Sequence, residues 1–222
     1  MDAHGIWPGP ADVGYFTEAQ AGSFGETLRG FLKFLELPPG LRVLDAGTGP
    51  GLVPRLLLDQ GATLAVGSDD SPAMLRRARD LSVEALPRAH HQPDYVLADA
   101  GRLPFASGSL GASVATNLLF LLPDPAAGLA ELVRVVGPGG TVGMLNPTDR
   151  MSTVAAEAFA HERGLSGFAQ FSFVNYGRLA EEHRRLSLEQ WAQLARDAGL
   201  QEVASTSRAG GLIAFVKGRR GA

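Results

Sequence analysis

Three glycines and an aspartate within residues 43–51 form the pattern best suited to bind a ligand. Gly47, Gly49 and Gly51 allow the backbone to turn tightly and to approach a bound molecule, and the helix expected after them presents unpaired N–H groups. Asp45 stands just before the glycines, where its charge would repel a pyrophosphate but could accept from an ammonium group or order the loop amides. The pattern therefore favours a nucleotide-type ligand with a cationic part.

Further polar residues follow the strands expected downstream. Asp69 and Asp99 follow the second and third predicted strands, and Thr116 lies at the end of the fourth. Ligands of open parallel sheets bind beyond the carboxyl ends of the strands, so these side chains are well placed for binding. Asp69 also lies 18 residues after Gly51, close to the offset of about 20 at which an acid binds a ribose hydroxyl in nucleotide-binding folds.

The glycine spacing argues against a dinucleotide. A dinucleotide fingerprint requires the pattern G-x-G-x-x-G, but here Gly51 comes one position early and Leu52 takes the place of the third glycine. NAD binding is therefore less favoured, and a nucleotide-dependent oxidoreductase stays open as a weaker alternative.

The strands and helices that position these residues alternate along the chain. Strands are predicted at 42–46, 63–68, 95–98, 112–117 and 141–145. Helices are predicted at 52–60, after Ser71-Pro72 and at 125–136, with residues 137–140 as a helix stop. This alternation predicts a parallel sheet with right-handed crossovers.

Two further helices and a strand pair flank this core. Ser23 with Glu26, and Ser187 with Gln190, have the spacing of capping boxes at helix starts. The segments 201–207 and 211–217 are predicted as strands, and a pair this close in sequence can only be antiparallel.

Composition limits the class of protein. At 222 residues and 45% hydrophobic content, we expect one well-buried domain. The net charge of -3 provides no general basic field for nucleic acid. The chain has no cysteine and no His/Asp cluster with ligand spacing, so neither thiol catalysis nor a metal site is supported. Residues 1–10 lack a secretory pattern and the longest apolar region, 110–122, is too short to span a bilayer, so we expect a cytoplasmic protein without a membrane partner.

Four stretches of the chain resemble the class I S-adenosylmethionine-dependent methyltransferases, in particular the small-molecule group that includes quinone-biosynthesis enzymes. They are residues 43–51, 67–75, 98–105 and 131–140, in the order found in that family. The resemblance implies an α/β, Rossmann-like, doubly wound and mostly parallel seven-stranded sheet with an antiparallel C-terminal strand. It also implies S-adenosyl-L-methionine as cofactor and direct methyl transfer to a small organic acceptor at O, N or C.

Carried over to this sequence, the resemblance assigns roles to individual residues. Asp45 and the loop amides would hold the methionine part, and Asp69 would accept from the two ribose hydroxyls. Asp99 would accept from the adenine amino group, the Ala100 N–H would donate to the ring, Met74 would pack near it and Thr116 would contact the cofactor. The cofactor-binding set expected in this way is Asp45, Ala46, Gly47, Thr48, Gly49, Gly51, Asp69, Asp70, Met74, Asp99, Ala100 and Thr116.

Simpler roles stay open for several of these residues. Asp45 could only order its loop, and Asp99 could only cap the turn that follows it. Asp70 could be a solvated neighbour, and Met74 could belong to the core. A protein that keeps the cofactor site without methylating, as a catalyst of another reaction or as a ligand sensor, is the main functional alternative.

The acceptor site is less clearly marked. The single domain divides into an N-terminal helical lid segment (1–39), a cofactor-binding core (40–146), an insertion (147–185) and a C-terminal helix with a strand pair (186–222). Five aromatic side chains of the insertion could pack an apolar or aromatic acceptor, or could extend the core: Phe159, Phe168, Phe171, Phe173 and Tyr176. No histidine has a catalytic spacing, and the candidates for a general base are His161, His183 and Tyr15.

Overall fold

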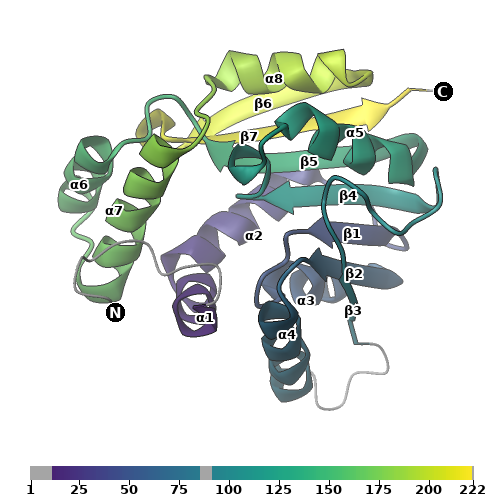
Figure 1. Cartoon of the computed structure of the whole chain (residues 1–222), viewed down its shortest axis with the longest axis horizontal. Helices are drawn as coiled ribbons and strands as arrows, with labels where there is room; N and C mark the ends of the chain where they lie inside the picture. Colours follow the sequence, from purple (N-terminus) through teal and green to yellow (C-terminus); the bar gives the residue numbers. More distant parts are fainter. Residues whose placement is uncertain (1–11, 86–91, 222) are drawn as a thin grey trace.

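The computed structural model describes residues 12–85 and 92–221, which form a seven-stranded sheet with helices on both faces (Figure 1). The sheet order is β3-β2-β1-β4-β5-β7-β6. Strands β1 to β5 pair in parallel, whereas β7 is antiparallel to both of its neighbours. The expected doubly wound sheet with an antiparallel C-terminal strand is therefore confirmed. The strands are β1 (Arg42–Ala46), β2 (Leu64–Asp69), β3 (Asp94–Leu97), β4 (Leu110–Thr116), β5 (Val136–Pro147), β6 (Leu200–Arg208) and β7 (Ile213–Arg220).

Strand β1 lies at the point where the order of the sheet reverses. It pairs with β2 on one side and with β4 on the other, and its last four residues are buried. This continuous burial is typical of a central parallel strand that is covered on both faces. The glycine loop that follows β1 therefore lies at the position where open α/β sheets bind their ligands.

Helices cover both faces of the sheet. α2 (Ser23–Leu35), α3 (Leu52–Asp59) and α4 (Pro72–Ala85) lie on one face, whereas α5 (Pro125–Val135) and α8 (Leu188–Asp197) lie on the other (Figure 1). The buried side of α2 packs on β5 and β7, where Gly143 leaves room for Leu35: a Cβ at Gly143 would lie 2.6 Å from a methyl group of that leucine.

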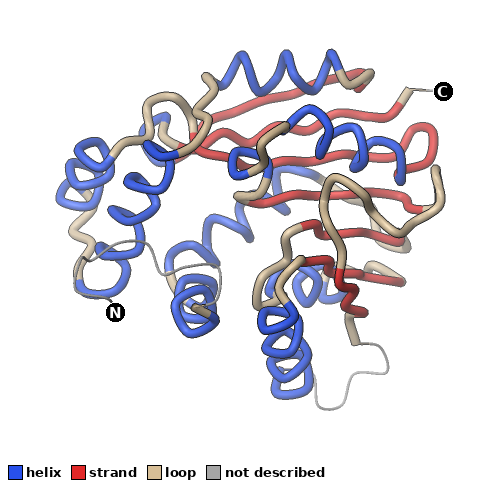
Figure 2. The backbone as a smooth tube through the Cα atoms, viewed as in Figure 1, coloured by secondary structure: helices blue, strands red, loops and turns tan. Residues whose placement is uncertain are grey.

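Three further helices lie beyond the carboxyl ends of the parallel strands. α6 (Thr153–Glu162) and α7 (Gly167–Glu182) pack against each other, and α1 (Val13–Ala21) contacts α7 (Figure 2). The predicted lid segment and the predicted insertion thus meet at the edge of the sheet where a ligand is expected. Within residues 12–85 and 92–221, no helix is both long enough and apolar enough to cross a membrane.

Two local predictions are wrong, and both errors come from neighbouring elements. Ser23 is the first residue of α2 and does not cap it, because Gly22 is the N-cap of α2 and also the C-cap of α1, where its N–H donates to carbonyls of α1. Residues 137–140 do not separate α5 from β5, because β5 begins at Val136 and pairs with Leu110 before a bulge. The capping box of Ser187 and Gln190 is confirmed by both of its hydrogen bonds. The prediction that residues 1–10 contain no secretory signal concerns residues outside the described part of the chain.

Candidate active site

The loop after β1 is shaped by its glycines. Gly47, Gly49 and Gly51 have φ values of 71°, 54° and 77°, a region that strains other L-residues. A Cβ at Gly51 would also lie 2.5 Å from the hydroxyl oxygen of Tyr95. The loop is anchored to the end of β2, because the N–H groups of Gly47 and Thr48 both donate to the Ser68 carbonyl. The backbone therefore turns sharply at the edge of the sheet.

Asp69, at the end of β2, is held next to this loop. Its Oδ2 accepts from the Gly49 N–H at 2.8 Å, and its Oδ1 accepts from the Ser71 N–H at 3.0 Å. Burial raises the pKa of Asp69, and these two backbone hydrogen bonds partly oppose that shift. Each carboxylate oxygen can still accept a further hydrogen bond, so Asp69 can both order the loop and receive the hydroxyls of a ligand.

Asp45 is a fully buried carboxyl group without a hydrogen-bond partner. It has no exposed surface, and among the described residues neither of its oxygens is hydrogen-bonded. Burial raises the pKa of Asp45 to about 7. The nearby Thr48 hydroxyl favours the charged form, although it does not meet hydrogen-bond geometry, and the charge of Asp69 raises the pKa further. Because no part of this carboxyl is exposed, a cationic ligand group would favour its charged form through electrostatic attraction and not through direct contact.

The other predicted binding residues lie along the same edge of the sheet. Ala46 and Thr116 end the adjacent strands β1 and β4, and the Ala98 N–H donates to the Asp69 carbonyl, which places the segment after β3 beside β2. Asp99 is exposed and accepts from the Gly101 N–H at 2.7 Å, as a turn cap would; Ala100 lies between them. The structure thus brings the strand-end residues together at one edge of the sheet.

Met74 and Asp70 differ in their surroundings. Met74 is 4% exposed in the first turn of α4, and its N–H donates to the Ser71 hydroxyl at 3.3 Å. Asp70 is exposed directly after β2. Met74 can therefore pack beneath a ligand at the end of β2, whereas Asp70 can reach one only from the solvent side.

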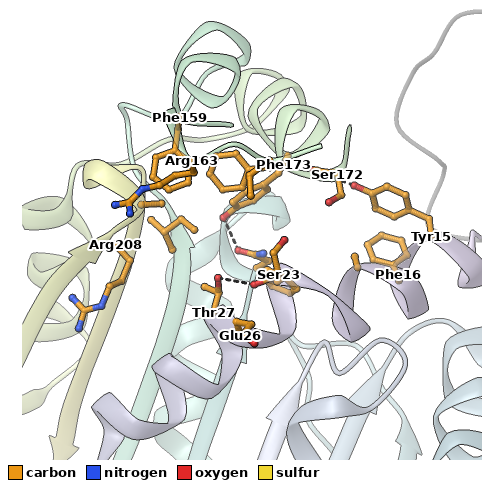
Figure 3. A pocket seen from close by; sticks show the side chains of 17 residues that line it. Tyr15, Phe16, Ser23, Glu26, Thr27, Phe159, Arg163, Ser172, Phe173 and Arg208 are labelled. Atoms are coloured by element: carbon orange, nitrogen blue, oxygen red, sulfur yellow. Dashed lines mark hydrogen bonds between the residues drawn. The ribbon is translucent and has the colours of Figure 1, made fainter. Parts of the chain in front are cut away.

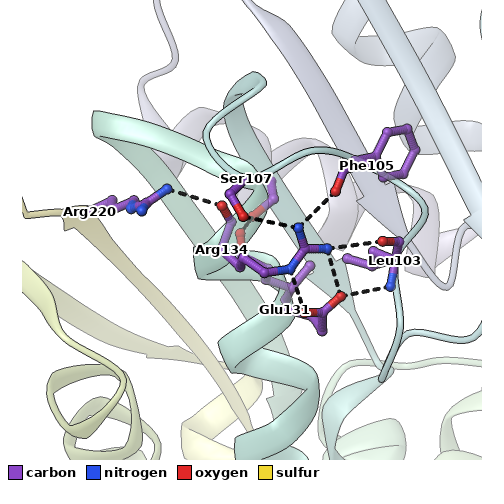
Figure 4. Close-up of polar contacts among 8 residues, drawn as sticks. Leu103, Phe105, Ser107, Glu131, Arg134 and Arg220 are labelled. Carbon is purple, nitrogen blue, oxygen red and sulfur yellow. Dashed lines mark hydrogen bonds and ion pairs between the residues drawn. The ribbon is translucent and has the colours of Figure 1, made fainter.

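The segment after β3 is fixed by Arg134 of α5 (Figure 4). The Arg134 guanidinium donates to the carbonyls of Leu103 and Phe105 at 2.9 and 2.8 Å, and it pairs with Glu131, whose Oε2 accepts from the Leu103 N–H. Glu131 and Arg134 belong to one of the four family-like stretches, and Leu103 and Phe105 belong to another. The two stretches therefore occur together for a structural reason: side chains of residues 131–140 hold the backbone of residues 98–105 in place.

Gln20 is a contact of the glycine loop that sequence reasoning missed. Its Nε2 donates to the Thr48 carbonyl at 3.3 Å, and its Oε1 accepts from the N–H of Leu52, the first residue of α3, at 3.1 Å. Gln20 thus joins α1 to the loop and to the helix after it. Since Gln20 lies 28 residues before Thr48 and stands in no motif, no pattern in the sequence indicates this contact.

A cavity of about 550 Å³ lies among α1, α2, α6, α7 and the ends of β6 and β7. Aromatic side chains from the two predicted acceptor segments line it, among them Tyr15, Phe16, Phe159 and Phe173 (Figure 3). Phe168 and Phe171 are not among its lining residues and instead pack against the ring of Tyr15. Of the five aromatic side chains of the insertion, three therefore line the cavity, and the other two pack behind Tyr15, a residue of the cavity wall.

Asn117 connects this cavity to the strand ends. It follows Thr116 directly, lines the cavity and has a φ of 53°, which asparagine tolerates better than most residues. Its Oδ1 accepts a hydrogen bond of 2.6 Å from the hydroxyl of Tyr176, a residue of α7. The sequence places Asn117 at the end of a strand but does not indicate this partner, which is 59 residues away.

The three candidate bases occupy different places. Tyr15 lines the cavity, donates to the Ser172 carbonyl at 3.3 Å and has a pKa raised by burial. His161 is an exposed residue of α6 and does not line the cavity. His183 follows α7, where its Nδ1 lies 2.9 Å from the Leu179 carbonyl oxygen, and it also lies outside the cavity wall. Of the three candidates, only Tyr15 thus lines the cavity. Within the described residues, no group of three or more His, Asp or Glu could hold a metal ion.

Comparison with known proteins identifies the family. Residues 44–144 match the family model described as a methyltransferase domain. The chain is also 31% identical over 189 residues to the demethylmenaquinone methyltransferase of Corynebacterium kroppenstedtii, an alignment that covers 82% of this chain and 78% of that relative. The chain belongs to the class I S-adenosylmethionine-dependent methyltransferases. S-adenosylmethionine is accordingly the methyl donor of this methyltransferase, and methyl transfer is its reaction.

Further relatives agree with this family and show the breadth of its fold. The demethylmenaquinone methyltransferase of Beutenbergia cavernae is 28% identical over 86% of this methyltransferase and 79% of the relative. The magnesium protoporphyrin IX methyltransferase of Synechocystis PCC 6803 has the same fold, with a TM-score of 0.62 at 20% identity over 88% and 82% of the two chains. A [4+2]-cyclase, SpnF, also shares the fold, with a TM-score of 0.66 at 18% identity over 88% and 80% of the chains. The fold alone therefore does not fix the reaction.

Proposed function

We propose that this methyltransferase acts on a small acceptor with an apolar, planar body, which binds in the cavity of about 550 Å³. The observation that carries the proposal is the position of this cavity: Asn117 lines it and directly follows Thr116, at the edge of the sheet that holds the glycine loop. The volume fits a small molecule, and aromatic walls favour a flat apolar one. Relatives named for demethylmenaquinone and magnesium protoporphyrin IX, both planar ring systems, support this class of acceptor.

The cofactor-binding residues form part of the same proposal. The buried, unpartnered carboxyl of Asp45 attracts the cationic methionine part through its charge, and Asp69 accepts from the ribose hydroxyls while it keeps its hydrogen bonds to the loop. Asp99, Ala100 and Met74 surround the adenine at the ends of β2 and β3. The buried, unsatisfied carboxyl of Asp45 fits a cofactor with a cationic methionine part, because an apolar or anionic ligand would leave the negative charge of Asp45 uncompensated.

The protein contributes chiefly by positioning the acceptor. Bound S-adenosylmethionine supplies an electrophilic methyl group on a sulfonium, and displacement at such a group requires an in-line nucleophile. Tyr176 fixes the carboxamide of Asn117 through its hydroxyl, which leaves the amide NH₂ as a donor at the cavity wall. The raised pKa of Tyr15 keeps its proton on the phenol, so Tyr15 acts as a hydrogen-bond donor. Residues 147–185 serve as the acceptor cover, since α6 and α7 provide Phe159 and Phe173.

The test is product formation from S-adenosylmethionine across a panel of planar and aliphatic acceptors, followed by mass spectrometry. Phe173→Ala removes a ring from the cavity wall, and the control Val154→Ala removes part of an exposed apolar side chain of α6 that does not line it. We expect Phe173→Ala to raise the KM of planar acceptors about tenfold, the loss typical of one aromatic contact, with cofactor affinity unchanged. Equal effects of the two substitutions, or methylation of aliphatic acceptors alone, would contradict the proposal.

A further inference from the structure

One side of the cavity carries two arginines. Arg163 follows α6 and Arg208 ends β6, and both line the cavity. Figure 3 shows them on the same side of the pocket, away from Tyr15 and Phe16, which lie on the other side. One side of the wall is therefore cationic, and Phe159 lies beside Arg163 there.

Neighbouring groups hold both guanidinium groups without neutralising them. The guanidinium carbon of Arg163 lies 5.4 Å from the ring centroid of Phe159, and that of Arg208 lies 5.3 Å from the ring centroid of Phe215. Nη1 of Arg208 also donates to the Thr206 hydroxyl at 2.8 Å and to the Ser207 carbonyl at 2.9 Å. A stacked guanidinium keeps its planar fork of donors available at its edge.

Neither arginine forms an ion pair with a carboxylate of the described residues. Glu26 of α2 also lines the cavity, yet it pairs with neither of them. Arg150 adds a third positive charge nearby, because a Cβ at Gly211 would lie 2.7 Å from its Nη1. Gly211 belongs to the short turn η2 (Ala209–Gly211), which directly follows Arg208. This local positive charge contrasts with the net charge of -3 of the whole chain.

We propose that the acceptor carries a carboxylate, which binds to Arg163 and Arg208 while its planar body lies against Phe159 and Phe173. The inference rests on the proposed function, since it concerns the acceptor of the same cavity. Guanidinium groups match the geometry of a carboxylate and can donate two parallel hydrogen bonds to it. Binding at this side would fix one end of the acceptor, so that the distance from the carboxylate to the nucleophilic atom selects which atom receives the methyl group.

The test compares a planar acid with its neutral amide. 3-Hydroxy-2-naphthoate and 3-hydroxy-2-naphthamide are titrated by calorimetry into the full-length enzyme saturated with the demethylated cofactor. We expect the acid to bind about tenfold more tightly than the amide, since charge-assisted hydrogen bonds at a partly exposed site are of moderate strength. This preference should weaken as salt is raised, because salt screens exposed charges. It should disappear in the double variant Arg163→Gln, Arg208→Gln and persist in part in the double lysine variant.

Arg29→Gln is the matched control, because Arg29 is an exposed residue of α2 that does not line the cavity. The control should keep the full preference for the acid. If the acid binds no more tightly than the amide, including the case in which neither binds, the proposal is overturned. It is also overturned if the glutamine variant keeps the preference. Because calorimetry needs no turnover, an acid preference without methylated product from any acceptor would refute the proposed function and would leave only carboxylate binding by Arg163 and Arg208.

Discussion

At pH 8, replacing Asp45 by asparagine should stabilise the protein without its cofactor while it weakens cofactor binding. Asp45 is fully buried with no hydrogen-bond partner among the described residues, and burial raises its pKa from 3.8 to about 7. A carboxyl whose pKa is higher in the folded than in the unfolded state opposes folding increasingly as pH rises from the lower to the higher value. The ionisation penalty is therefore small at acidic pH and reaches its limit above pH 7.

The magnitude follows from the two pKa values. At about 1.4 kcal/mol per pH unit, the penalty amounts to about 2 kcal/mol at pH 5 and about 4 kcal/mol at pH 8. Asparagine does not titrate, although its buried NH₂ group costs about 1–3 kcal/mol if it finds no acceptor. That cost is the same at every pH. The difference in unfolding free energy between Asp45→Asn and the wild type should therefore shift in favour of the variant by about 2–3 kcal/mol from pH 5 to pH 8.

Urea unfolding of both proteins without cofactor, at unit steps from pH 5 to pH 8, measures this shift. The exposed Asp80 of α4 provides the control, since Asp80→Asn removes the same charge from the surface. Calorimetry with S-adenosylmethionine should show that the wild-type affinity falls below pH 7, where Asp45 takes up a proton, and that the variant binds at least about tenfold more weakly at pH 8. A free-energy difference that is constant with pH would refute the reasoning about burial. An unchanged affinity for S-adenosylmethionine would refute the attraction between Asp45 and the cationic part of the cofactor.

Three other substitutions test the remaining parts of the site. Asp69→Ala should lower S-adenosylmethionine affinity at least about 100-fold in calorimetry, because charged hydrogen bonds to both ligand and loop are lost, and unchanged affinity would remove the ribose assignment. Gln20→Ala should speed hydrogen exchange at Leu52 and through α1, and should cost about 1 kcal/mol of stability, as loss of a helix cap does. Unaltered exchange would show that the hydrogen bonds of Gln20 do not hold α1 in place. Tyr176→Phe should lower kcat about tenfold at unchanged cofactor affinity, because the carboxamide of Asn117 loses its fixed orientation. Steady-state kinetics with an accepted planar substrate measures this effect. An unchanged kcat would exclude Asn117 from positioning the acceptor.

The sequence predicts the cofactor side of the fold well because that information is local. A buried strand, three glycines and Asp45 follow one another within residues 43–51, and the strand-end position of Asp69 follows from the alternation of strands and helices alone. By contrast, the contacts of Gln20 and Asn117 depend on residues 28 and 59 positions away, which only the packed structure brings close. Ser23 has the spacing of a cap, but the helix before it leaves no room for one. Local patterns thus predict elements, whereas contacts between distant segments decide the acceptor site.

The hydrogen bonds of Arg134 also affect the order in which the chain can assemble. They reach back 29–31 residues, to the carbonyls of Phe105 and Leu103, so all partners of this network are present in the chain once α5 is complete. The entropy cost of closing a loop grows slowly with its length, and these contacts need no residue that follows α5. During synthesis from the N-terminus, the segment that carries Asp99 can therefore become ordered before α6 and α7 have left the ribosome. A nascent chain would then form the cofactor-binding half of the site before the half that we propose binds the acceptor.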